Sequence, residues 1–441
     1  MTAPDGRFAV LVADQGFGAI TVLADTMRSL GYRPALITGP ASQDQLAAWG
    51  KHHDAIEVVD NPYSEQALQA AARRIPGPLA GLFSCYDGCV LPAALAASAL
   101  GLPHCDTAAL RRSRNKYEAR LRLREIGVDR VPAALVGLDG DLAAIEQTVG
   151  PYPLIVKPVN GIASHLVVKC RSRQELRAAL HRLHDSVSDD LAALYSHPIG
   201  LGESGHTDPS SEFLVEPFLT GPEYSAELVV SPHGVSRIAL LEKLMVDDVS
   251  FFETAFLSVE DRAVSERIWK FIEDAVTGIG LDSAMCHVEV IDTAEGVSLV
   301  EINAGRPGGA RIATLVRGAL GRDEMIETVR AALYCWSPEF VQPEYGLPAG
   351  LVISYPPGPG VIERIEGVDQ CRDIPGVVAV SALLHPGHVV STMDRECFGV
   401  VALTSGVGSD GLREIHRQLL ERVEYVLRTS DVATVSAPVD T

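Results

Sequence analysis

The chain has 441 residues, 47% hydrophobic and 21% charged, which excludes wholesale disorder and a small module held together by disulfides. Asp and Glu number 57 against 37 Lys and Arg, and the net charge of −20 argues against a nucleic-acid partner. The first apolar run, Phe8–Ala13, is too short for a signal peptide or a membrane span, so we expect a cytoplasmic protein without membrane contact. The eight cysteines lack metal or disulfide spacing, and we expect them to be reduced.

The first 110 residues alternate short apolar runs with helical stretches, which predicts a parallel sheet with helices on both faces. The predicted strands are Phe8–Ala13, Ala35–Thr38, Ala55–Val59 and Leu79–Phe83, and the predicted helices are Ile20–Leu30, Ser64–Ile75 and Val90–Leu100. Gly16 and Gly18 follow the first strand, as glycines do in dinucleotide-binding folds. Because the third glycine of that pattern is missing, we interpret the segment as a plain turn.

A helix is predicted at Ser113–Ile126, and the strands that dominate after it indicate an antiparallel α+β region. These strands are Leu154–Lys157, His165–Lys169, Phe213–Glu216, Tyr224–Val230, Val235–Leu241, Met285–Ile291 and Val297–Asn303. The segment Ser196–Ser211 is rich in Gly, Ser, His and Pro, which predicts a long loop. Helices are predicted over Ala263–Ile279 and Ala310–Leu320.

From Gly350 onward, short strands precede one amphipathic helix, which predicts a third and smaller α+β unit. The strands are Leu351–Ser354, Val377–Ala382, Val389–Ser391 and Val400–Thr404, and the helix is Gly411–Leu427. We therefore expect three domains, residues 1–110, 111–335 and 336–430, and a disordered tail over residues 431–441.

A predicted hairpin between Met285 and Asn303 is the most informative stretch. Residues 292–296 form a turn between two alternating runs, and a turn centred near Glu295 places Glu289 directly opposite Glu301. Strand alternation places Val288, Val290, Val300 and Ile302 on the core face and His287, Glu289, Glu301 and Asn303 on the other face.

Two opposed carboxylates, about 4.5–5.5 Å apart at their Cβ atoms, repel each other, and a divalent cation offsets this repulsion. Mg²⁺ prefers carboxylate and amide oxygens together with phosphates, so we expect Glu289, Glu301 and Asn303 to bind it. Arg306, on the following loop, is placed to hold an anionic oxygen. Two alternatives stay open: a solvated hairpin face, and one carboxylate of raised pKa that serves as an acid.

Two further segments suit a nucleotide. One strand ends in Lys157 and is followed by the small-residue loop 159–164, where an ammonium group and backbone N–H groups can clamp phosphates. Another strand ends at Glu216 and continues into a proline-stiffened connection to Glu223, which can present backbone groups to a purine and a carboxylate to a ribose. Taken singly, the first segment is better explained as an exposed lysine next to a hairpin turn. The alternative for the second segment is a β-turn with two surface glutamates.

In order, these segments resemble the ATP-grasp superfamily and, within it, the carboxylate–amine ligases of the L-amino acid ligase (dipeptide synthetase) type. The resemblance runs from about Phe8 to about Leu427 and includes Asn115-Lys116-Tyr117 at the entry to the central domain. It implies an ATP-grasp fold of the α/β and α+β classes, with an N-terminal Rossmann-like parallel-sheet domain and a C-terminal α+β domain. An ATP lid is implied at about residues 133–221.

The resemblance also implies roles for single residues. The ATP-binding residues are Lys116, Lys157, Ser164, Glu216, Pro217, Phe218, Leu219 and Glu223, and the ligands for Mg²⁺, or for Mn²⁺, are Glu289, Glu301 and Asn303. Arg306 and Lys157 are the implied catalytic residues. The implied substrate contacts are Lys243, Glu253, Arg306, Gly308 and Gly309.

The function that this resemblance implies is the activation of a carboxylate by ATP, as an acyl phosphate, and its coupling to the amine of an amino acid. Small-molecule carboxylates and amino acids are the expected partners, and a homodimer is the usual assembly of the family. Three other functions stay open: an ATP-grasp ligase for bicarbonate or a purine intermediate, a regulator that binds ATP without turnover, and a nicotinamide-dependent dehydrogenase built on Gly16 and Gly18.

Overall fold

A computed structural model describes residues 6–14, 19–161, 164–189, 208, 211–246, 251–309, 315, 317, 321, 323–334, 348–390 and 398–428. Several predictions therefore lie outside the described residues. They are the turn at Gly16 and Gly18, almost all of the Ser196–Ser211 loop, most of the Ala310–Leu320 helix, and the tail after residue 430.

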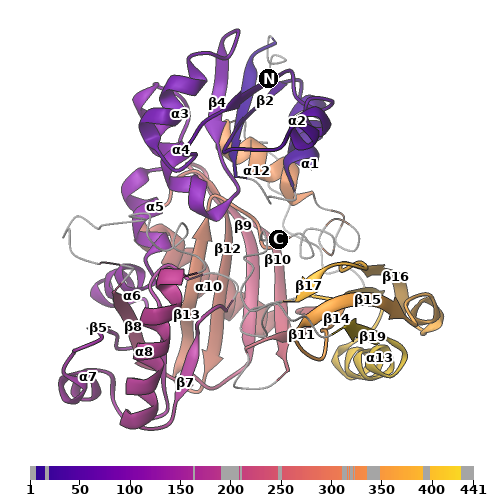
Figure 1. The fold of residues 1–441 in the computed structure, drawn as a ribbon. Coiled ribbons are helices and arrows are strands. Elements are labelled where there is room, and N and C mark those ends of the chain that lie inside the picture. The colour runs from indigo at the N-terminus through magenta and orange to yellow at the C-terminus, as the bar shows by residue number, and fades with distance from the viewer. Residues whose placement is uncertain are drawn as a thin grey trace.

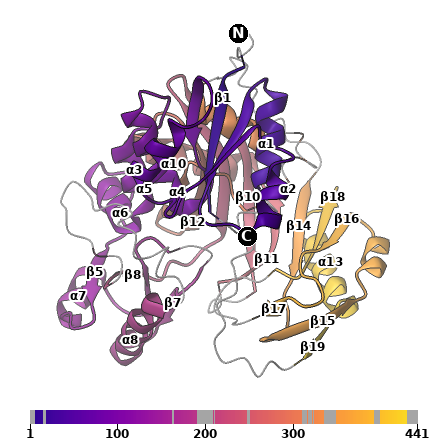
Figure 2. The ribbon, with the colours of Figure 1, turned by 45° about the horizontal axis from the view of Figure 1, so that its top comes forward.

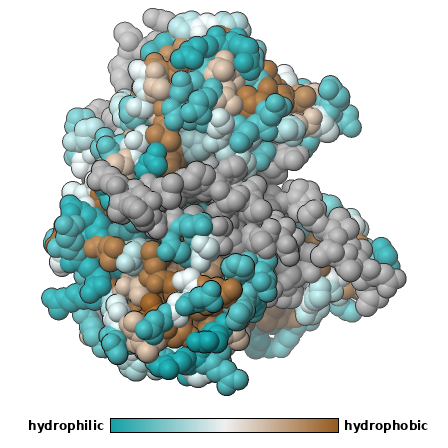
Figure 3. Space-filling model, turned by 60° about the vertical axis from the view of Figure 1, so that its left-hand side comes forward, coloured by the Kyte–Doolittle hydropathy of each residue, from teal (hydrophilic) through white to brown (hydrophobic). Residues whose placement is uncertain are grey.

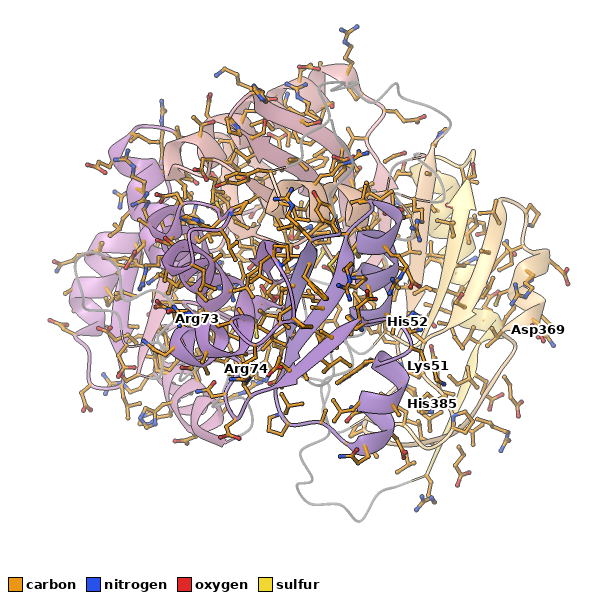
Figure 4. All side chains as sticks on the ribbon, turned by 90° about the horizontal axis from the view of Figure 1, so that it is seen from above. Lys51, His52, Arg73, Arg74, Asp369 and His385 are labelled. Carbon is orange, nitrogen blue, oxygen red and sulfur yellow. The ribbon has the colours of Figure 1, made fainter. Side chains whose placement is uncertain are left out.

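The N-terminal unit is the parallel sheet with helices on both faces that the alternating pattern predicts (Figures 1 and 4). Its strands are β1 (Phe8–Ala13), β2 (Arg33–Thr38), β3 (Ala55–Val58) and β4 (Leu79–Phe83), in the order β3-β2-β1-β4. Its helices are α1 (Ile20–Ser29), α2 (Gln43–Trp49), α3 (Glu65–Ala72) and α4 (Asp87–Ala99). All six residues of β1 are buried, as expected for a parallel strand covered from both sides. In Figure 4, Lys51 and Arg73 lie on opposite sides of this sheet.

The single helix predicted at Ser113–Ile126 is wrong, because the structure has two helices that meet at Asn115. They are α5 (Thr107–Arg114) and α6 (Lys116–Glu125). The Asn115 side chain caps α6 by accepting hydrogen bonds from the N–H groups of Tyr117 and Glu118. The break places Lys116 in the first turn of a new helix, and its N–H group donates to the carbonyl of Val159 at 2.8 Å.

A small antiparallel sheet stands apart from the rest, at the lower left of Figure 1. Its strands are β5 (Ala134–Gly137), β6 (Leu154–Pro158), β7 (Val168–Cys170) and β8 (Glu212–Pro217), in the order β5-β8-β6-β7. It is covered by α7 (Leu142–Val149) and α8 (Arg173–Asp189). The predicted strand His165–Lys169 begins later than expected, because residues 165–167 lie in a turn before β7.

A larger sheet of eight strands forms the centre of the molecule, in the order β13-β12-β9-β10-β11-β14-β18-β16. Its central strands are β9 (Glu223–Ser231), β10 (Gly234–Met245), β11 (Glu253–Ser258), β12 (Ala284–Thr293) and β13 (Gly296–Ala304). One face packs on α10 (Arg262–Ile279), whose apolar side includes the fully buried Trp269. The other face packs on α12 (Glu324–Ala332), which also contacts α1 of the N-terminal unit.

The C-terminal strands β14 (Ala349–Ser354), β16 (Val377–Ala382) and β18 (Val400–Ser405) extend the same large sheet. A second sheet combines β15 (Gly360–Glu366), β17 (Val389–Val390) and β19 (Glu424–Arg428), and Figure 2 shows this unit to one side of the N-terminal sheet. The helix predicted at Gly411–Leu427 is wrong at its end. The structure has α13 (Ser409–Arg422), and the chain then pairs with β15 as the strand β19.

Helices long and apolar enough to cross a membrane do not occur among the residues that the structure describes. On the face shown in Figure 3, hydrophobic and hydrophilic residues lie side by side over the lower half, where the small antiparallel sheet and its helices are found.

Candidate active site

The structure pairs Glu289 of β12 directly with Glu301 of β13, as the hairpin pattern predicts. His287 pairs with Asn303 in the same way, so all four polar side chains share one face. The prediction that Val300 faces the core is wrong. The pairing shifts by one residue after Glu289, because Val290 pairs with Leu299 and not with Val300. Val300 is therefore an extra residue in β13, a β-bulge, and its neighbour Leu299 is the buried residue.

A buried lysine offsets the charge of this carboxylate pair. The Nζ atom of Lys243 lies 3.0 Å from Glu289, 2.7 Å from Glu223 and 2.8 Å from Glu253, in each case measured to a carboxylate oxygen. The Lys243 side chain is only 3% exposed. Burial alone would lower the pKa of Lys243, but its three carboxylate partners outweigh burial and hold it well above the ordinary value. The structure thus brings together residues predicted for the ribose, the metal and the substrate.

Lys116 connects the other glutamate of the pair to the predicted phosphate loop. Its Nζ atom lies 2.8 Å from a carboxylate oxygen of Glu301 and donates a hydrogen bond of 2.6 Å to the carbonyl of Gly161. The Asn303 amide also donates to Glu301. Lys116 therefore joins three segments, namely the start of α6, the loop after β6 and the hairpin.

Neither carboxylate of the pair has a raised pKa, which argues against the alternative that one of them serves as an acid. Burial would raise the pKa of Glu289, but Lys243 and His287 outweigh burial and hold that pKa well below its usual range. Burial would likewise raise the pKa of Glu301, and Lys116 reverses the shift. The lowered pKa favours the carboxylate form of both groups, which is the form that binds a metal ion.

Lys157 is held by Glu216 in a buried ionic network. Its Nζ atom lies 2.6 Å from one carboxylate oxygen of Glu216, and Arg120 lies 3.0 Å from the other. Arg120 also pairs with Asp129 and donates to the carbonyl of Leu299, while the N–H group of Leu299 donates to Asp129 at 2.9 Å. This network ties the small sheet to the strand that carries Glu301. The Glu216 carboxylate thus contacts two cations here, rather than being directed freely at an adenine.

The connection that follows Glu216 is held against the hairpin turn. The carbonyl of Pro222 accepts from the N–H group of Asp292 at 2.9 Å, and a Cβ atom on Gly221 would lie 2.1 Å from the carbonyl oxygen of Asp292. Only glycine therefore fits at residue 221, where φ is +154°. Pro217, Phe218 and Leu219 are all partly exposed, and Lys169 lies over the Phe218 ring, 3.6 Å from its centroid.

Ser164 lies in the loop after β6, with a positive φ of 53°. Its hydroxyl group donates to the carbonyl of Phe251 at 3.4 Å, and Phe251 also has a positive φ, of 57°. Two loops on different sheets thus meet beside the predicted phosphate site.

Arg306 is held by the N-terminal unit. Its Nε atom lies 2.8 Å from Asp87, the first residue of α4, and Arg114 lies 3.0 Å from the other Asp87 oxygen. Burial would raise the pKa of Asp87, but the two guanidinium groups hold it well below its usual range. The preceding Gly305 has φ +92°, and a Cβ atom there would lie 2.4 Å from a methyl group of Val90 on α4.

His287 links Glu289 to a second buried carboxylate, Glu227. The Nε2 atom of His287 lies 3.1 Å from Glu289, and Nδ1 lies 2.6 Å from Glu227. Burial would lower the pKa of His287, but the two carboxylates raise it to about 10. Both oxygens of Glu227 also accept from the N–H group of Gly308, at 3.1 and 3.2 Å. Gly309 is exposed, with open space where a side chain would stand.

The chemistry of these donors fits Mg²⁺. Glu289 and Glu301 supply carboxylate oxygens and Asn303 supplies an amide oxygen, which are the ligands that this ion prefers. Groups of three or more His, Cys, Asp and Glu side chains that could hold a metal do not occur within the described part of the chain. Two carboxylates and an amide suit a site in which nucleotide phosphates complete the coordination.

Sequence reasoning missed Asp87 and Glu227. Asp87 follows a predicted strand of another domain, and no local pattern connects it with Arg306. The sequence did offer an indication for Glu227, because an acidic residue in the middle of the apolar strand β9 is unusual unless it has a partner. Pairing β9 with β12 would have placed it beside His287, its partner in the sheet.

Two segments match known domain families. Residues 150–314 match the ATP-grasp domain, and residues 352–428 match the L-amino acid ligase C-terminal domain 2. Dapdiamide A synthase of Enterobacter agglomerans is 22% identical over 285 residues, which are 63% of this chain and 62% of that protein. The match thus spans less than two thirds of that relative.

Solved structures show the same fold along nearly the whole chain. The L-amino acid ligase from Bacillus licheniformis superposes with a TM-score of 0.78 at 20% identity, covering 97% of this chain and 100% of that one. The biotin carboxylase domain dimer of Hydrogenobacter thermophilus 2-oxoglutarate carboxylase, in complex with MgADP, ADP and bicarbonate, gives 0.63 at 16% identity, with coverages of 95% and 90%.

The chain has the ATP-grasp fold, as the sequence predicts. The domain that follows, over residues 352–428, is similar to the C-terminal domain 2 of L-amino acid ligase, and the fold of the chain is similar to that of the L-amino acid ligase from Bacillus licheniformis.

Proposed function

We propose that this protein activates a substrate carboxylate with Mg²⁺-ATP and joins it to the amine of an amino acid, forming a dipeptide or a related amide. The observation that carries the proposal is the convergence of Lys116, Lys243 and Arg306 around the opposed pair Glu289 and Glu301. Cations and metal-binding carboxylates gathered on one sheet face suit the transfer of a phosphoryl group, which depends on positioning and charge neutralisation.

The proposed nucleotide site lies between the small sheet and the large sheet. Lys157 lies near the end of β6, Lys116 donates to the loop that follows β6, and both would bind phosphate oxygens. The backbone from Pro217 to Leu219 would contact the adenine, and Glu223, held by Lys243, would contact the ribose. Ser164, on the loop that meets Phe251, would cover the phosphates.

The proposed metal ligands are Glu289, Glu301 and Asn303, and when bound there Mg²⁺ would supply positive charge to the phosphate oxygens. Lys243 holds Glu289 from one side and Lys116 holds Glu301 from the other, so that the two carboxylates are fixed before a ligand arrives. Such preorganisation lowers the cost of reorganising charge during the reaction.

The first step would form the acyl phosphate. A carboxylate oxygen attacks the γ-phosphorus, an acyl C–O–P linkage forms, and the bond from that phosphorus to the β–γ bridging oxygen breaks, which releases ADP. Arg306, fixed by Asp87, would stabilise the charge on the phosphoryl oxygens.

The second step would form the amide. A neutral amine attacks the acyl carbon, the C–N bond forms, the C–O bond to phosphate breaks, and inorganic phosphate leaves while the amine nitrogen loses a proton. Lys243, Glu253, Gly308 and Gly309 border the space beside Arg306 and would contact the substrates.

A screen of paired amino acids tests the proposal. Phosphate release with Mg²⁺-ATP should rise above the ATP-only rate for at least one pair, and mass spectrometry should find the amide. If phosphate release rises only with bicarbonate or with a purine intermediate, the protein is an ATP-grasp ligase of the carboxylase or purine-pathway type, and the amino acid ligase proposal is wrong. If ATP binds but no substrate stimulates phosphate release, the protein is a regulator that binds ATP without turnover, and the ligase proposal is wrong.

A homodimer and a cytoplasmic location belong to the same proposal. A biotin carboxylase domain with this fold was solved as a dimer, which supports the first. Light scattering of the full chain tests it, with a mass near twice 47.1 kDa as the expected result.

A further inference from the structure

Glu324, the first residue of α12, is a buried acidic residue. It is 1% exposed, and within the described ranges neither of its carboxylate oxygens has a hydrogen-bond partner. An isolated buried carboxyl group is costly unless something compensates for it. A bound ligand that donates hydrogen bonds to this carboxyl group would supply the compensation.

Helix capping does not explain this residue. The neighbouring Asp323 already caps α12, because its side chain accepts from the N–H groups of Met325 and Ile326. An acidic residue in the first turn also favours the helix dipole, but it does so equally well at the surface. Neither effect requires Glu324 to be buried.

The helix places Glu324 over the face of the sheet that carries the candidate active site. The far end of α12 is fixed at the start of β12, where the hydroxyl group of Ser283 donates to the carbonyl of Ala331 at 3.0 Å. From there, seven residues of helix span about 10 Å, and four residues of strand from Ser283 to His287 span about 13 Å. Glu324 therefore lies near His287 and its sheet partner Glu227.

The charges agree with this proximity. Burial and the negative charge of Glu227 raise the pKa of Glu324 to about 10, although the positive charge of His287 opposes them. Glu227 itself is fully engaged by His287 and by the N–H group of Gly308. Among the described residues of this group, Glu324 is thus the one whose carboxyl oxygens have no hydrogen-bond partner.

The site is close to the reacting groups. Gly308 follows Arg306 by two residues, so their Cα atoms lie at most about 7 Å apart. Glu227 fixes Gly308, and Glu324 faces Glu227 from α12. A ligand at Glu324 would therefore lie beside the arginine that we assign to the transferring phosphoryl group.

We infer that Glu324, supported by Glu227, binds the ammonium group of an amino acid substrate. A metal ion is the weaker candidate at Glu324, because groups of three or more His, Cys, Asp and Glu side chains that could hold one do not occur in the described part of the chain. An ammonium group brings three N–H donors and a positive charge, which match two unpaired oxygens beside a second carboxylate. This inference rests on the proposed ligase function and specifies one of its substrates.

The amino acid at this site is the carboxyl donor rather than the attacking amine. An ammonium group paired with a carboxylate keeps its proton, so its nitrogen has no lone pair for attack. The donor keeps its α-ammonium group through both steps, whereas the acceptor must lose a proton. A site that stabilises the protonated form therefore selects donors and prevents their nitrogen from reacting.

A cavity on the same side of α12 has room for a small side chain. Its volume is about 50 Å³, and its mostly apolar lining includes Phe83, Gly305, Thr328 and Ala332. Thr328 lies one helical turn from Glu324 and donates to the Glu324 carbonyl at 2.7 Å. Donors with small apolar side chains therefore belong among the probes.

Trapping the acyl phosphate with hydroxylamine tests the inference without any need to know the acceptor. The donor probes are alanine, valine and aspartate, and their des-amino counterparts propionate, isovalerate and succinate, each with Mg²⁺-ATP and the full chain. Wild type should form hydroxamate from at least one amino acid and at least tenfold less from its counterpart. Glu324→Gln should raise KM for that amino acid at least tenfold and change KM for the counterpart less than twofold.

Glu327→Gln is the matched control, because Glu327 lies on the same helix and pairs with Arg330 near the surface. It should leave all KM values within twofold. Equal use of amino and des-amino acids by wild type overturns the inference, and this measurement stands even if Glu324→Gln fails to fold. Equal impairment of both classes by Glu324→Gln also overturns it. Hydroxamate from none of the carboxylates contradicts the ligase proposal itself.

Discussion

Glu289 and Glu301 face each other although the hairpin turn is not centred between them. The turn pairs Thr293 with Gly296, and a regular ladder from that pair would set Glu289 opposite Val300. Val300 is instead an extra residue, so Glu301 takes the opposing place. The bulge thus gives β13 both a buried Leu299 next to the turn and a carboxylate directed at the site.

Neutralising either glutamate should abolish the use of magnesium. Glu301→Gln and Glu289→Gln remove a charge from the proposed ion site, and we expect kcat for ATP turnover to fall by about 10²–10³. A magnesium titration of ADP release measures this. Glu295→Gln, in the exposed turn of the same hairpin, is the control and should behave as wild type. Unchanged magnesium dependence in both site variants would remove these residues from the site.

Removing the Lys243 charge should destabilise the protein and make its stability depend on magnesium. Lys243→Met leaves Glu223, Glu253 and Glu289 without their shared cation, and breaking a buried ionic cluster costs about 3–5 kcal/mol. Magnesium with ADP should raise the melting temperature of this variant more than that of wild type. Calorimetry with and without the ligands measures both effects, and equal shifts would contradict the account. The surface variant Lys270→Met is the control.

Asp87→Asn should slow the reaction without weakening nucleotide binding. The change leaves Arg306 and Arg114 without the carboxylate that holds them, so the proposed phosphoryl-stabilising group loses its fixed position. We expect kcat to fall about tenfold or more, with KM for ATP nearly unchanged. Steady-state kinetics of phosphate release separate the two constants. A larger change in KM than in kcat would argue for a role in binding.

Gly305→Ala should destabilise the fold in a way that a second substitution partly reverses. The added Cβ atom meets Val90 at 2.4 Å, and the φ of +92° is unfavourable for alanine. We expect a loss of about 2–4 kcal/mol in the free energy of unfolding. Val90→Ala in the same chain should recover the steric part only. A double-mutant cycle by urea unfolding measures the coupling, and simple additivity would show that the contact does not exist.

Glu324→Gln should become relatively more stable than wild type as the pH rises. The pKa of Glu324 is raised to about 10 in the folded chain, against 4.5 as its ordinary value. Between these values the folded chain holds the extra proton, so wild-type stability falls as pH increases, whereas glutamine does not titrate. We expect the variant to gain about 1–3 kcal/mol between pH 5.5 and 8.5. Urea unfolding at both pH values measures the difference, and a pH-independent difference would show that the residue is ionised throughout.

Local patterns sufficed for much of this molecule. The alternation in β12 and β13 identified the opposed glutamates, and the apolar periodicity located β1 and α10 almost to the residue. The bulge at Val300 was not visible, because valine suits either face of a strand. The strand β19 was read as helix because its residues continue the amphipathic spacing of α13, and pairing with β15 decides otherwise.

Contacts between distant parts of the chain could not be predicted from local sequence patterns. The resemblance to a known family correctly gave the fold, and it selected the lysines that the structure brings to the hairpin. It did not reveal what holds Arg306, because Asp87 belongs to another sheet and no local pattern joins them. Glu324 was missed for a similar reason, since its burial results from helix packing on the sheet rather than from its own segment.

The anchoring of Arg306 by Asp87 limits how this protein can be taken apart. The nucleotide residues all follow residue 115, so a truncated chain that starts there would keep them but would lose the carboxylate that orients the arginine. Exchanging the N-terminal unit for that of another ligase would preserve this orientation only if the donor supplies an acid at the same helix start. In a chimeric protein, α4 and the loop after β13 therefore have to come from the same parent protein.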